Sequence, residues 1–128
     1  MGLDVRTIAK RYYRRKEIQE AIASFSSHKE VVPRYMDAFG RRPDIIEYPN
    51  DVLNLAEKGA TSFHCSEEIW SNPMDLQTSS TPESLNSLRT GWDLIIDIDS
   101  DFLDYSKIAT RLIINAMKFH SIKKTRGG

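Results

Sequence analysis

The sequence contains one cysteine, Cys65, no low-complexity segment and no long hydrophobic run. A single cysteine excludes an intrachain disulfide and a zinc site made of several cysteines. The apolar runs are only a few residues long, whereas a helix that crosses a bilayer needs about 20 apolar residues. The N-terminal residues, MGLDVRTIAK, also lack the apolar stretch of a secretory signal. We therefore expect a soluble, intracellular protein that has no membrane partner.

The composition is that of one ordinary globular domain. The 128 residues are 40% hydrophobic and 28% charged. A chain of this length buries about 60–70% of its unfolded surface when it folds. Since that is enough for a hydrophobic core without metal or disulfide, we expect residues 1–128 to form a single domain.

The formal net charge of zero conceals an uneven distribution of charge along the chain. Residues 1–50 carry 10 basic and 7 acidic side chains (+3), residues 51–104 carry 2 and 11 (−9), and residues 105–128 carry 6 and 0 (+6). An acidic middle between basic ends fits carboxylates that gather around a metal while the flanks attract a polyanion. Solvated charged faces would produce the same pattern without such a function.

Hydrophobic spacing and capping residues predict helices that bracket two short strands. Residues 71–87 are rich in Ser, Thr, Asn and Pro and predict a long loop or insertion. Asn50, Thr81 and Asp104 are typical helix N-caps, and Gly59 follows the end of one predicted helix. The predicted elements are helices at residues 10–26, 50–58, 82–90 and 105–119, and strands at residues 60–66 and 92–98.

Two acidic residues lie where the second predicted strand ends. Side chains alternate along a strand, so Asp97 and Asp99 would project from one face, about 6.5 to 7 Å apart along the backbone. Two carboxylates held so close repel each other unless a cation neutralises them. The pair therefore predicts a site for a hard divalent ion, Mg²⁺ or Mn²⁺. The alternative is that these aspartates end a strand and begin a turn.

Two other aspartate-rich motifs fit this segment less well. A calcium-binding EF-hand loop that starts at Asp97 needs Gly at its sixth position and Glu at its twelfth, where the chain has Phe102 and Ile108. That motif is excluded. A haloacid-dehalogenase-type phosphatase has Thr or Val two residues after its second aspartate, where this chain has Asp101. Such a phosphatase fragment remains a weaker alternative.

Three further segments of the chain carry motifs, at residues 12–15 (YYRR), 59–73 (GATSFHCSEEIWSNP) and 91–99 (GWDLIIDID). Together they resemble the small, catalytic subunit of the archaeal and eukaryotic DNA primase. The first segment is similar to a motif in the N-terminal helix of that family, and the third is similar to its first catalytic motif. The second resembles the strand and turn that precede this motif in archaeal members. The resemblance extends from about Arg11 to His120, and the archaeal branch is the closer one.

The resemblance implies an α+β fold in which helices pack on a small, mostly antiparallel sheet, as in the N-terminal part of a primase catalytic core. It also implies nucleotidyl transfer that makes short primers on a single-stranded DNA template from nucleoside triphosphates, with two divalent metals, Mg²⁺ or Mn²⁺. Asp97 and Asp99 match metal ligands of the family, so the resemblance makes them catalytic residues. The implied partner is the primase large subunit, and the implied location is the cytoplasm of an archaeal cell.

The chain also departs from the family pattern. The family's second motif, a Ser-x-His strand, and its third, a later aspartate, lie downstream of the helix that ends near His120. We therefore expect this chain to be the N-terminal portion of a primase catalytic domain and to be inactive alone. Lys29 stands where the family often has arginine in an Arg-Glu-Phe motif. A non-catalytic remnant that binds metal or nucleic acid is the alternative function.

Several other side chains are candidates for binding. Arg14 and Arg15 continue the apolar face of the first predicted helix and could reach template or nucleotide phosphate. Alternatively, their aliphatic stems cover the rim of the core. We expect the histidines and tryptophans to have structural rather than ligand roles: His64 half-buried, His120 exposed, and Trp70 and Trp92 in the core or at hairpin corners.

Overall fold

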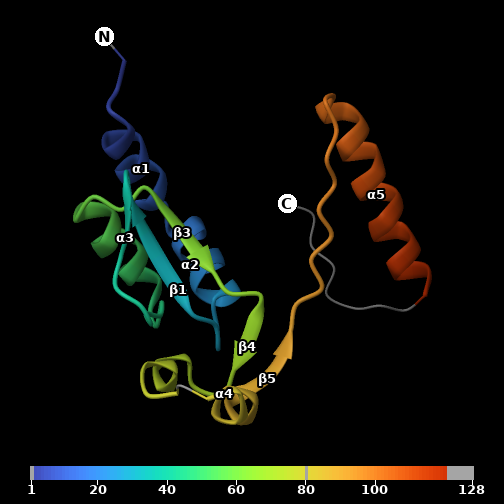
Figure 1. The fold of residues 1–128 in the computed structure, drawn as a ribbon. Coiled ribbons are helices and arrows are strands. Elements are labelled where there is room, and N and C mark those ends of the chain that lie inside the picture. The colour runs from blue at the N-terminus through green and yellow to red at the C-terminus, as the bar shows by residue number, and fades with distance from the viewer. Residues whose placement is uncertain (1, 80, 121–128) are drawn as a thin grey trace. The chain divides into compact units, whose positions relative to one another are not determined.

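The computed structural model describes residues 2–79 and 81–120. The chain divides into two units, residues 1–94 and residues 95–128. The elements, in chain order (Figure 1), are α1 (Val5–Tyr13), α2 (Lys16–Phe25), β1 (Val31–Tyr35), β2 (Ala38–Phe39), α3 (Pro49–Glu57), β3 (Ser62–Cys65), β4 (Glu68–Trp70), the 3₁₀ helix η1 (Pro73–Gln77), α4 (Pro82–Leu88), β5 (Arg89–Trp92) and α5 (Leu103–Phe119). Helices and small antiparallel sheets together make an α+β structure, which confirms the coarse fold class.

The first unit is built on a three-stranded antiparallel sheet with the order β2-β1-β3. Three helices, α1, α2 and α3, contact one another and lie beside this sheet (Figure 1). Val31 and Val52 are almost completely buried and form the core with Ile46. The half-buried side chains packed around these three are Tyr13, Ile22, Ala23, Leu55, Phe63 and Cys65.

The predicted helix at residues 10–26 is wrong as one continuous helix, because the chain forms α1 and α2 with a break between them. Arg15 has an extended backbone (ψ 123°) and serves as the N-cap of α2. The side-chain amide of Gln19 donates a 2.8 Å hydrogen bond to the carbonyl oxygen of Tyr13, near the end of α1. The buried Gln19 thus supplies a partner for a carbonyl at the helix end, so the break leaves that group satisfied.

The helices predicted near residues 50 and 82 are confirmed as α3 and α4. Thr81 accepts a 3.2 Å hydrogen bond from the backbone N–H of Ser84, as expected of an N-cap. Asn50 does not cap α3, because the helix already begins at Pro49. Instead, Asp51 accepts hydrogen bonds from backbone N–H groups that precede the helix. Gly59 follows the helix with φ +107°, a conformation that favours glycine.

A second sheet pairs β4 with β5 in antiparallel register. The connection between these strands contains η1 and α4, so the loop predicted at residues 71–87 is largely helical. Asn72 begins η1 by accepting a hydrogen bond from the backbone N–H of Met74. The connection therefore has local structure where its composition predicted a loop.

The strand predicted at residues 92–98 is wrong, since β5 ends at Trp92 and residues 93–100 have no regular secondary structure. The backbone N–H of Asp93 still donates to the carbonyl of Glu67 at 2.8 Å. In the described part of the chain no neighbouring strand pairs with the residues that follow. An apolar run becomes a strand only when another strand supplies its hydrogen-bond partners.

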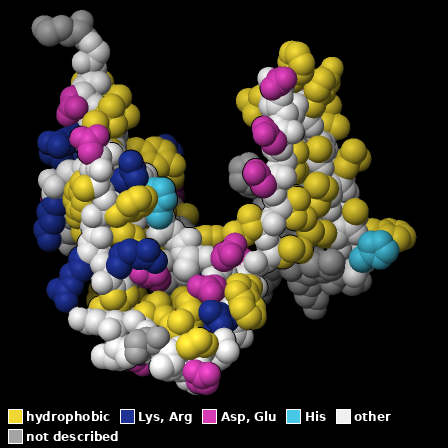
Figure 2. Space-filling view, viewed as in Figure 1, with side chains coloured by type: hydrophobic (Ala, Val, Ile, Leu, Met, Phe, Trp, Pro, Cys, Tyr) yellow, Lys and Arg dark blue, Asp and Glu magenta, His cyan; other side chains and the backbone are white. Residues whose placement is uncertain are grey.

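Helix α5 confirms the helix predicted at residues 105–119 but begins at Leu103. Asp104 is not its N-cap. Phe102 takes that position without a side-chain cap, and Ser100 Oγ accepts a hydrogen bond from the backbone N–H of Phe102. No residue of α5 is fully buried, and Figure 2 shows hydrophobic side chains exposed along the helix.

Candidate functional site

Asp97 and Asp99 lie in the extended segment before α5, where both side chains are exposed. Figure 2 shows acidic side chains following one another along this segment. Ile98, between them, is half-buried, whereas Leu94 and Ile95 are 78% and 63% exposed. The predicted strand-end setting is therefore absent, but the two carboxylates remain close in sequence and open to solvent.

These two residues offer the ligand type that a hard cation prefers but only two side-chain ligands. Carboxylate oxygens are ligands that Mg²⁺ and Mn²⁺ favour, and a single ion can complete its shell with water. Among residues 2–79 and 81–120, no three His, Cys, Asp or Glu side chains are grouped so that they could hold a metal. Asp97 and Asp99 thus offer two exposed carboxylates to a cation, and they do not by themselves account for a two-metal centre.

Arg14 and Arg15 lie together at the break between α1 and α2, and both are exposed. Arg15 Nε donates to Glu17 Oε1 at 2.8 Å, with both side chains more than half exposed. The backbone N–H of Glu17 and then the Arg15 guanidinium lower the pKa of the Glu17 carboxyl. These arginines belong to the first unit and the two aspartates to the second, so the predicted site residues are divided between units.

The two tyrosines beside these arginines have different environments. Tyr13 packs edge-on against Phe63, with ring centroids 5.0 Å apart, and its hydroxyl donates to the carbonyl of Thr61 at 3.3 Å. Burial raises the pKa of the Tyr13 hydroxyl. Tyr12 is 47% exposed. Part of the YYRR segment therefore stabilises the fold, and Tyr12, Arg14 and Arg15 form its exposed part.

Lys29 forms an ion pair with Asp93, the last acidic residue of the first unit, whose side chain is 33% exposed. The Lys29 side chain is only 6% exposed, and its ammonium lies 3.8 Å from the centroid of the Phe25 ring. The lysine that departs from the primase pattern thus holds the chain just after β5. Sequence reasoning missed this pair because 64 positions separate its members.

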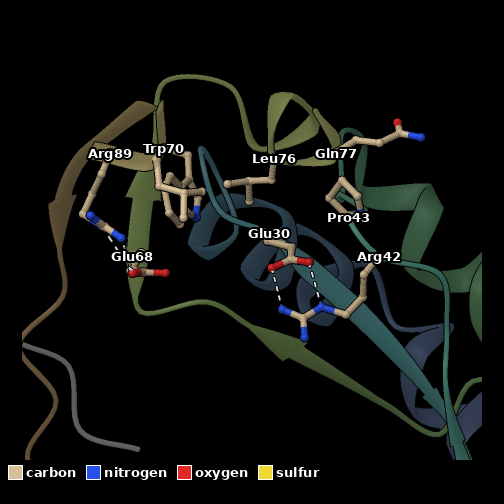
Figure 3. Close-up of a pocket in the computed structure, with 9 residues that line it drawn as sticks. Glu30, Arg42, Pro43, Glu68, Trp70, Leu76, Gln77 and Arg89 are labelled. Carbon is tan, nitrogen blue, oxygen red and sulfur yellow. Dashed lines mark hydrogen bonds and ion pairs between the residues drawn. The ribbon is translucent and has the colours of Figure 1, made fainter. Parts of the chain in front are cut away.

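A second group of charged side chains lies around Trp70. Arg42 pairs with Glu30, and Arg89 pairs with Glu68, each at 2.9 Å. The guanidinium carbon of Arg89 lies 5.0 Å from the centroid of the Trp70 ring. These residues line an open pocket of about 560 Å³ (Figure 3). They come from distant parts of the chain, so no motif in the sequence indicated that a pocket forms here.

The remaining aromatic and histidine predictions have mixed outcomes. Trp70 is buried, as expected, but Trp92 is 62% exposed. His64 is exposed rather than half-buried: its Nε2 lies 3.2 Å from Ser62 Oγ, and its ring packs edge-on against Phe39. His120 is exposed, as expected, and lies against the ring of Phe119.

None of the described helices combines the length and apolar character that a bilayer span requires. Comparisons with protein-family models, with curated proteins and with solved structures found no match to this chain.

Proposed function

We propose that the chain is a primase-type nucleotidyltransferase module in which Asp97 and Asp99 supply carboxylate ligands to Mg²⁺ or Mn²⁺. The observation that carries the proposal is this pair of exposed carboxylates, two residues apart in an extended segment. The substrates would be nucleoside triphosphates and a single-stranded DNA template. The family resemblance of residues 12–15, 59–73 and 91–99 supports this choice among metal-dependent activities.

The chemistry of the pair supports cation binding. Carboxylate oxygens are ligands that Mg²⁺ and Mn²⁺ favour, and Asp97 and Asp99 offer two carboxylates in one short segment. Both side chains are exposed, so water can fill the remaining coordination positions. A bound divalent ion would offset the charge on a nucleotide's phosphates.

The proposal includes the expectation that this chain does not make primers alone. Phosphoryl-transfer centres with two metals hold their ligands within about half an ångström of the productive geometry. Within the described residues, no third ligand is grouped with Asp97 and Asp99. The missing ligand and phosphate-binding residues must then come from elsewhere in an active assembly.

A primer-synthesis assay tests this function. The 128-residue chain is incubated with single-stranded DNA, labelled nucleotides and Mn²⁺, with and without the C-terminal portion of a related primase subunit. We expect product only in the reconstituted reaction, and we expect Asp97→Asn to abolish it. Asp101→Asn is the matched control, because it removes an exposed carboxylate of the same segment outside the pair.

Three outcomes would contradict the proposal. Product from the chain alone that Asp97→Ala abolishes would show a complete active site in these 128 residues. Reconstituted product that is unaffected by both Asp97→Asn and Asp99→Asn would show that these carboxylates are not metal ligands in catalysis. Binding of single-stranded DNA without any product, lost in the double variant Arg14→Gln, Arg15→Gln, would favour the binding module instead.

A further inference from the structure

Helix α5 has a line of exposed, mostly apolar side chains along one face, which we call the α5 seam. Thr110, Ile113 and Met117, on another face of the helix, are half-buried. The members of the seam are Tyr105, Ile108, Leu112, Asn115 and Phe119. Their steps of three and four residues keep them on one side of a helix. Within the described part of the chain, α5 therefore has one partly covered face and one open face.

The spacing of the seam is that of two helices that pack in a coiled coil. There, residues at positions a and d of a seven-residue repeat insert between those of a facing helix. In α5 Tyr105, Leu112 and Phe119 take the a positions, and Ile108 and Asn115 take the d positions. One polar residue in an otherwise apolar seam is a device that fixes the register of such a pair. The pattern thus favours a second helix as the cover of this face.

The charged residues at the two ends of the seam have opposite signs. Asp104 at the start of α5 and Lys118 near its end are exposed and lie on the same flank, at position g of the repeat. If a second α5 runs in the opposite direction, Asp104 of each copy lies beside Lys118 of the other. If it runs in the same direction, each end of the pair holds charges of one sign. The seam is therefore complementary in charge to an antiparallel copy of itself.

The exposed apolar area also suits a pair of copies. The apolar members of the seam are 53–85% exposed, and Phe102, one step before Tyr105 on the same side, is 66% exposed. Taking about 150–250 Å² for each large side chain, these residues expose roughly 600 Å² per copy. Two copies would then bury about 1,200 Å², which is close to the lower limit for a specific interface.

We propose that two copies of this chain pair through the α5 seam, with the two helices antiparallel. Leu112 of each copy packs beside Ile108 of the other, because a and d positions alternate along the seam and the second helix runs in reverse. Tyr105 then lies beside Asn115 of the second copy, so the phenol hydroxyl and the side-chain amide can form a hydrogen bond. Neither copy needs a metal at Asp97 and Asp99 for this contact.

The pair is expected to be weak. Arg111 lies on the same flank as Asp104 and Lys118, so the two Arg111 side chains face each other near the centre of an antiparallel pair. Like charges so placed oppose association. With the modest buried area, we expect a dissociation constant of about 10–100 µM. The chain is then a monomer at low micromolar concentrations, where its unfolding is followed.

The acidic residues of the second unit disfavour a membrane as the alternative partner. Amphipathic helices that lie on membranes are attracted to anionic lipids by a basic polar face. Asp97, Asp99 and Asp101 are exposed in the segment before α5, and Asp104 flanks the seam. Anionic lipids would repel these carboxylates, whereas a second copy provides Lys118 opposite Asp104.

Sedimentation velocity of the full chain, from low micromolar to several hundred micromolar, tests the proposal. We expect the unsubstituted protein to change from monomer to dimer, and Leu112→Asp to remain a monomer throughout. Leu103→Asp is the matched control, because Leu103 is 68% exposed, like Leu112 at 65%, but lies on the opposite side of α5. This control should dimerise like the unsubstituted protein. Circular dichroism at low micromolar concentration checks that both variants fold.

Cysteine cross-linking tests the direction of the pair. In a Cys65→Ser background, Asp104→Cys and Lys118→Cys each place one thiol at one end of the seam. A short bismaleimide should cross-link an equimolar mixture of the two variants at least about threefold faster than either variant alone, because the two different thiols lie at the same end of an antiparallel pair.

Four results would overturn the proposal. A monomer at every concentration of the unsubstituted protein would do so without any variant. Equal loss of dimer in Leu112→Asp and Leu103→Asp would show that the seam is not the contact. Faster cross-linking of either single variant than of the mixture would show a parallel pair. Binding of a monomeric chain to phosphatidylserine vesicles, lost in Leu112→Asp, would show a membrane surface instead.

Discussion

Residues 2–94 and residues 95–120 both contain large hydrophobic side chains, but the two regions differ in how far they bury them. In the first region Val31 of β1 and Val52 of α3 are 1% and 0% exposed and belong to one hydrophobic core. In the second region Ile95 and the helical residue Leu112 are 63% and 65% exposed. Hydrophobic spacing therefore predicted helices in both regions, but only in the first does a helix contribute buried side chains to a core.

An ion pair marks the boundary between the two regions. The buried ammonium of Lys29 and the half-buried carboxylate of Asp93 hold the chain immediately before this boundary. Beyond this pair the described residues offer the next segment no strand to pair with, so its apolar side chains stay exposed. The paired carboxylates proposed as metal ligands also lie in this second region.

The two regions should differ most in how far a new carboxylate lowers the free energy of unfolding. Val52→Asp puts a carboxylate into the core without a partner and should lower the free energy of unfolding by about 3–5 kcal/mol. Leu112→Asp adds the same charge to an exposed face of α5 and should change it by about 0.5 kcal/mol. Urea denaturation followed by circular dichroism measures both. Equal destabilisation by the two variants would show that α5 is also packed in a core.

Substituting an aspartate on either side of the boundary should also have different effects on stability. Asp93→Ala leaves the ammonium of Lys29 buried without its partner, which should cost about 3 kcal/mol of stability. Asp97→Ala removes an exposed carboxylate and should have an effect within about 0.5 kcal/mol. Tryptophan fluorescence during urea unfolding reports on both. A neutral Asp93→Ala variant would show that this ion pair does not anchor the boundary.

Limited proteolysis should locate the boundary along the chain. Leu94 and Phe102 are 78% and 66% exposed and lie outside the regular elements. Segments without backbone hydrogen bonds are cleaved before packed elements. Brief treatment with chymotrypsin, followed by mass spectrometry, should give first cuts between residues 92 and 103. First cuts inside β1 or α3 would contradict the division into two regions.

A smaller contrast should appear in cysteine reactivity. Burial raises the pKa of the Cys65 thiol, so at pH 8 the folded protein holds less of the reactive thiolate than an ordinary cysteine would. Because the pKa of the Cys65 thiol is higher in the folded protein than in the unfolded one, the contribution of the thiol to the free energy of unfolding is fully present below its ordinary pKa. That contribution is lost as the pH rises through the raised value.

The matched comparison is the double variant Cys65→Ser, Ser100→Cys, which moves the thiol to an exposed position in the second region. Iodoacetamide should alkylate the relocated thiol at pH 8 at least about tenfold faster than it alkylates Cys65 in the unsubstituted protein. Mass spectrometry over time gives both rates. Equal rates would show that Cys65 is not protected by burial.

Elements whose ends are fixed by residues close in sequence could be predicted, and elements that depend on other contacts could not. Thr81 and Gly59 act within a turn or two of their helix ends, so α4 and α3 could be predicted. The break at Arg15 could not, because the apolar spacing of residues 10–26 is that of one continuous helix and does not reveal that the Gln19 side chain bonds to the Tyr13 carbonyl. Strand β1 was missed because its interior residue Pro33 is unusual for a central strand.

In the candidate site, too, only the features that depend on residues close in sequence could be predicted. The spacing of Asp97 and Asp99 was visible in the sequence, but their strand setting required a neighbouring strand that the spacing could not reveal. The pocket at Trp70 depends on pairs such as Arg42–Glu30 and Arg89–Glu68, which are 12 and 21 positions apart. Only the fold brings these side chains together.

The most direct test of the central claim, that Asp97 and Asp99 bind a divalent ion, is a Mn²⁺ titration followed by amide NMR signals. We expect the signals of residues 96–102 to broaden at sub-stoichiometric Mn²⁺ in the unsubstituted protein and in Asp101→Asn. In the double variant Asp97→Asn, Asp99→Asn these signals should stay sharp, because the carboxylate ligands are gone. Equal broadening in the double variant would contradict the account.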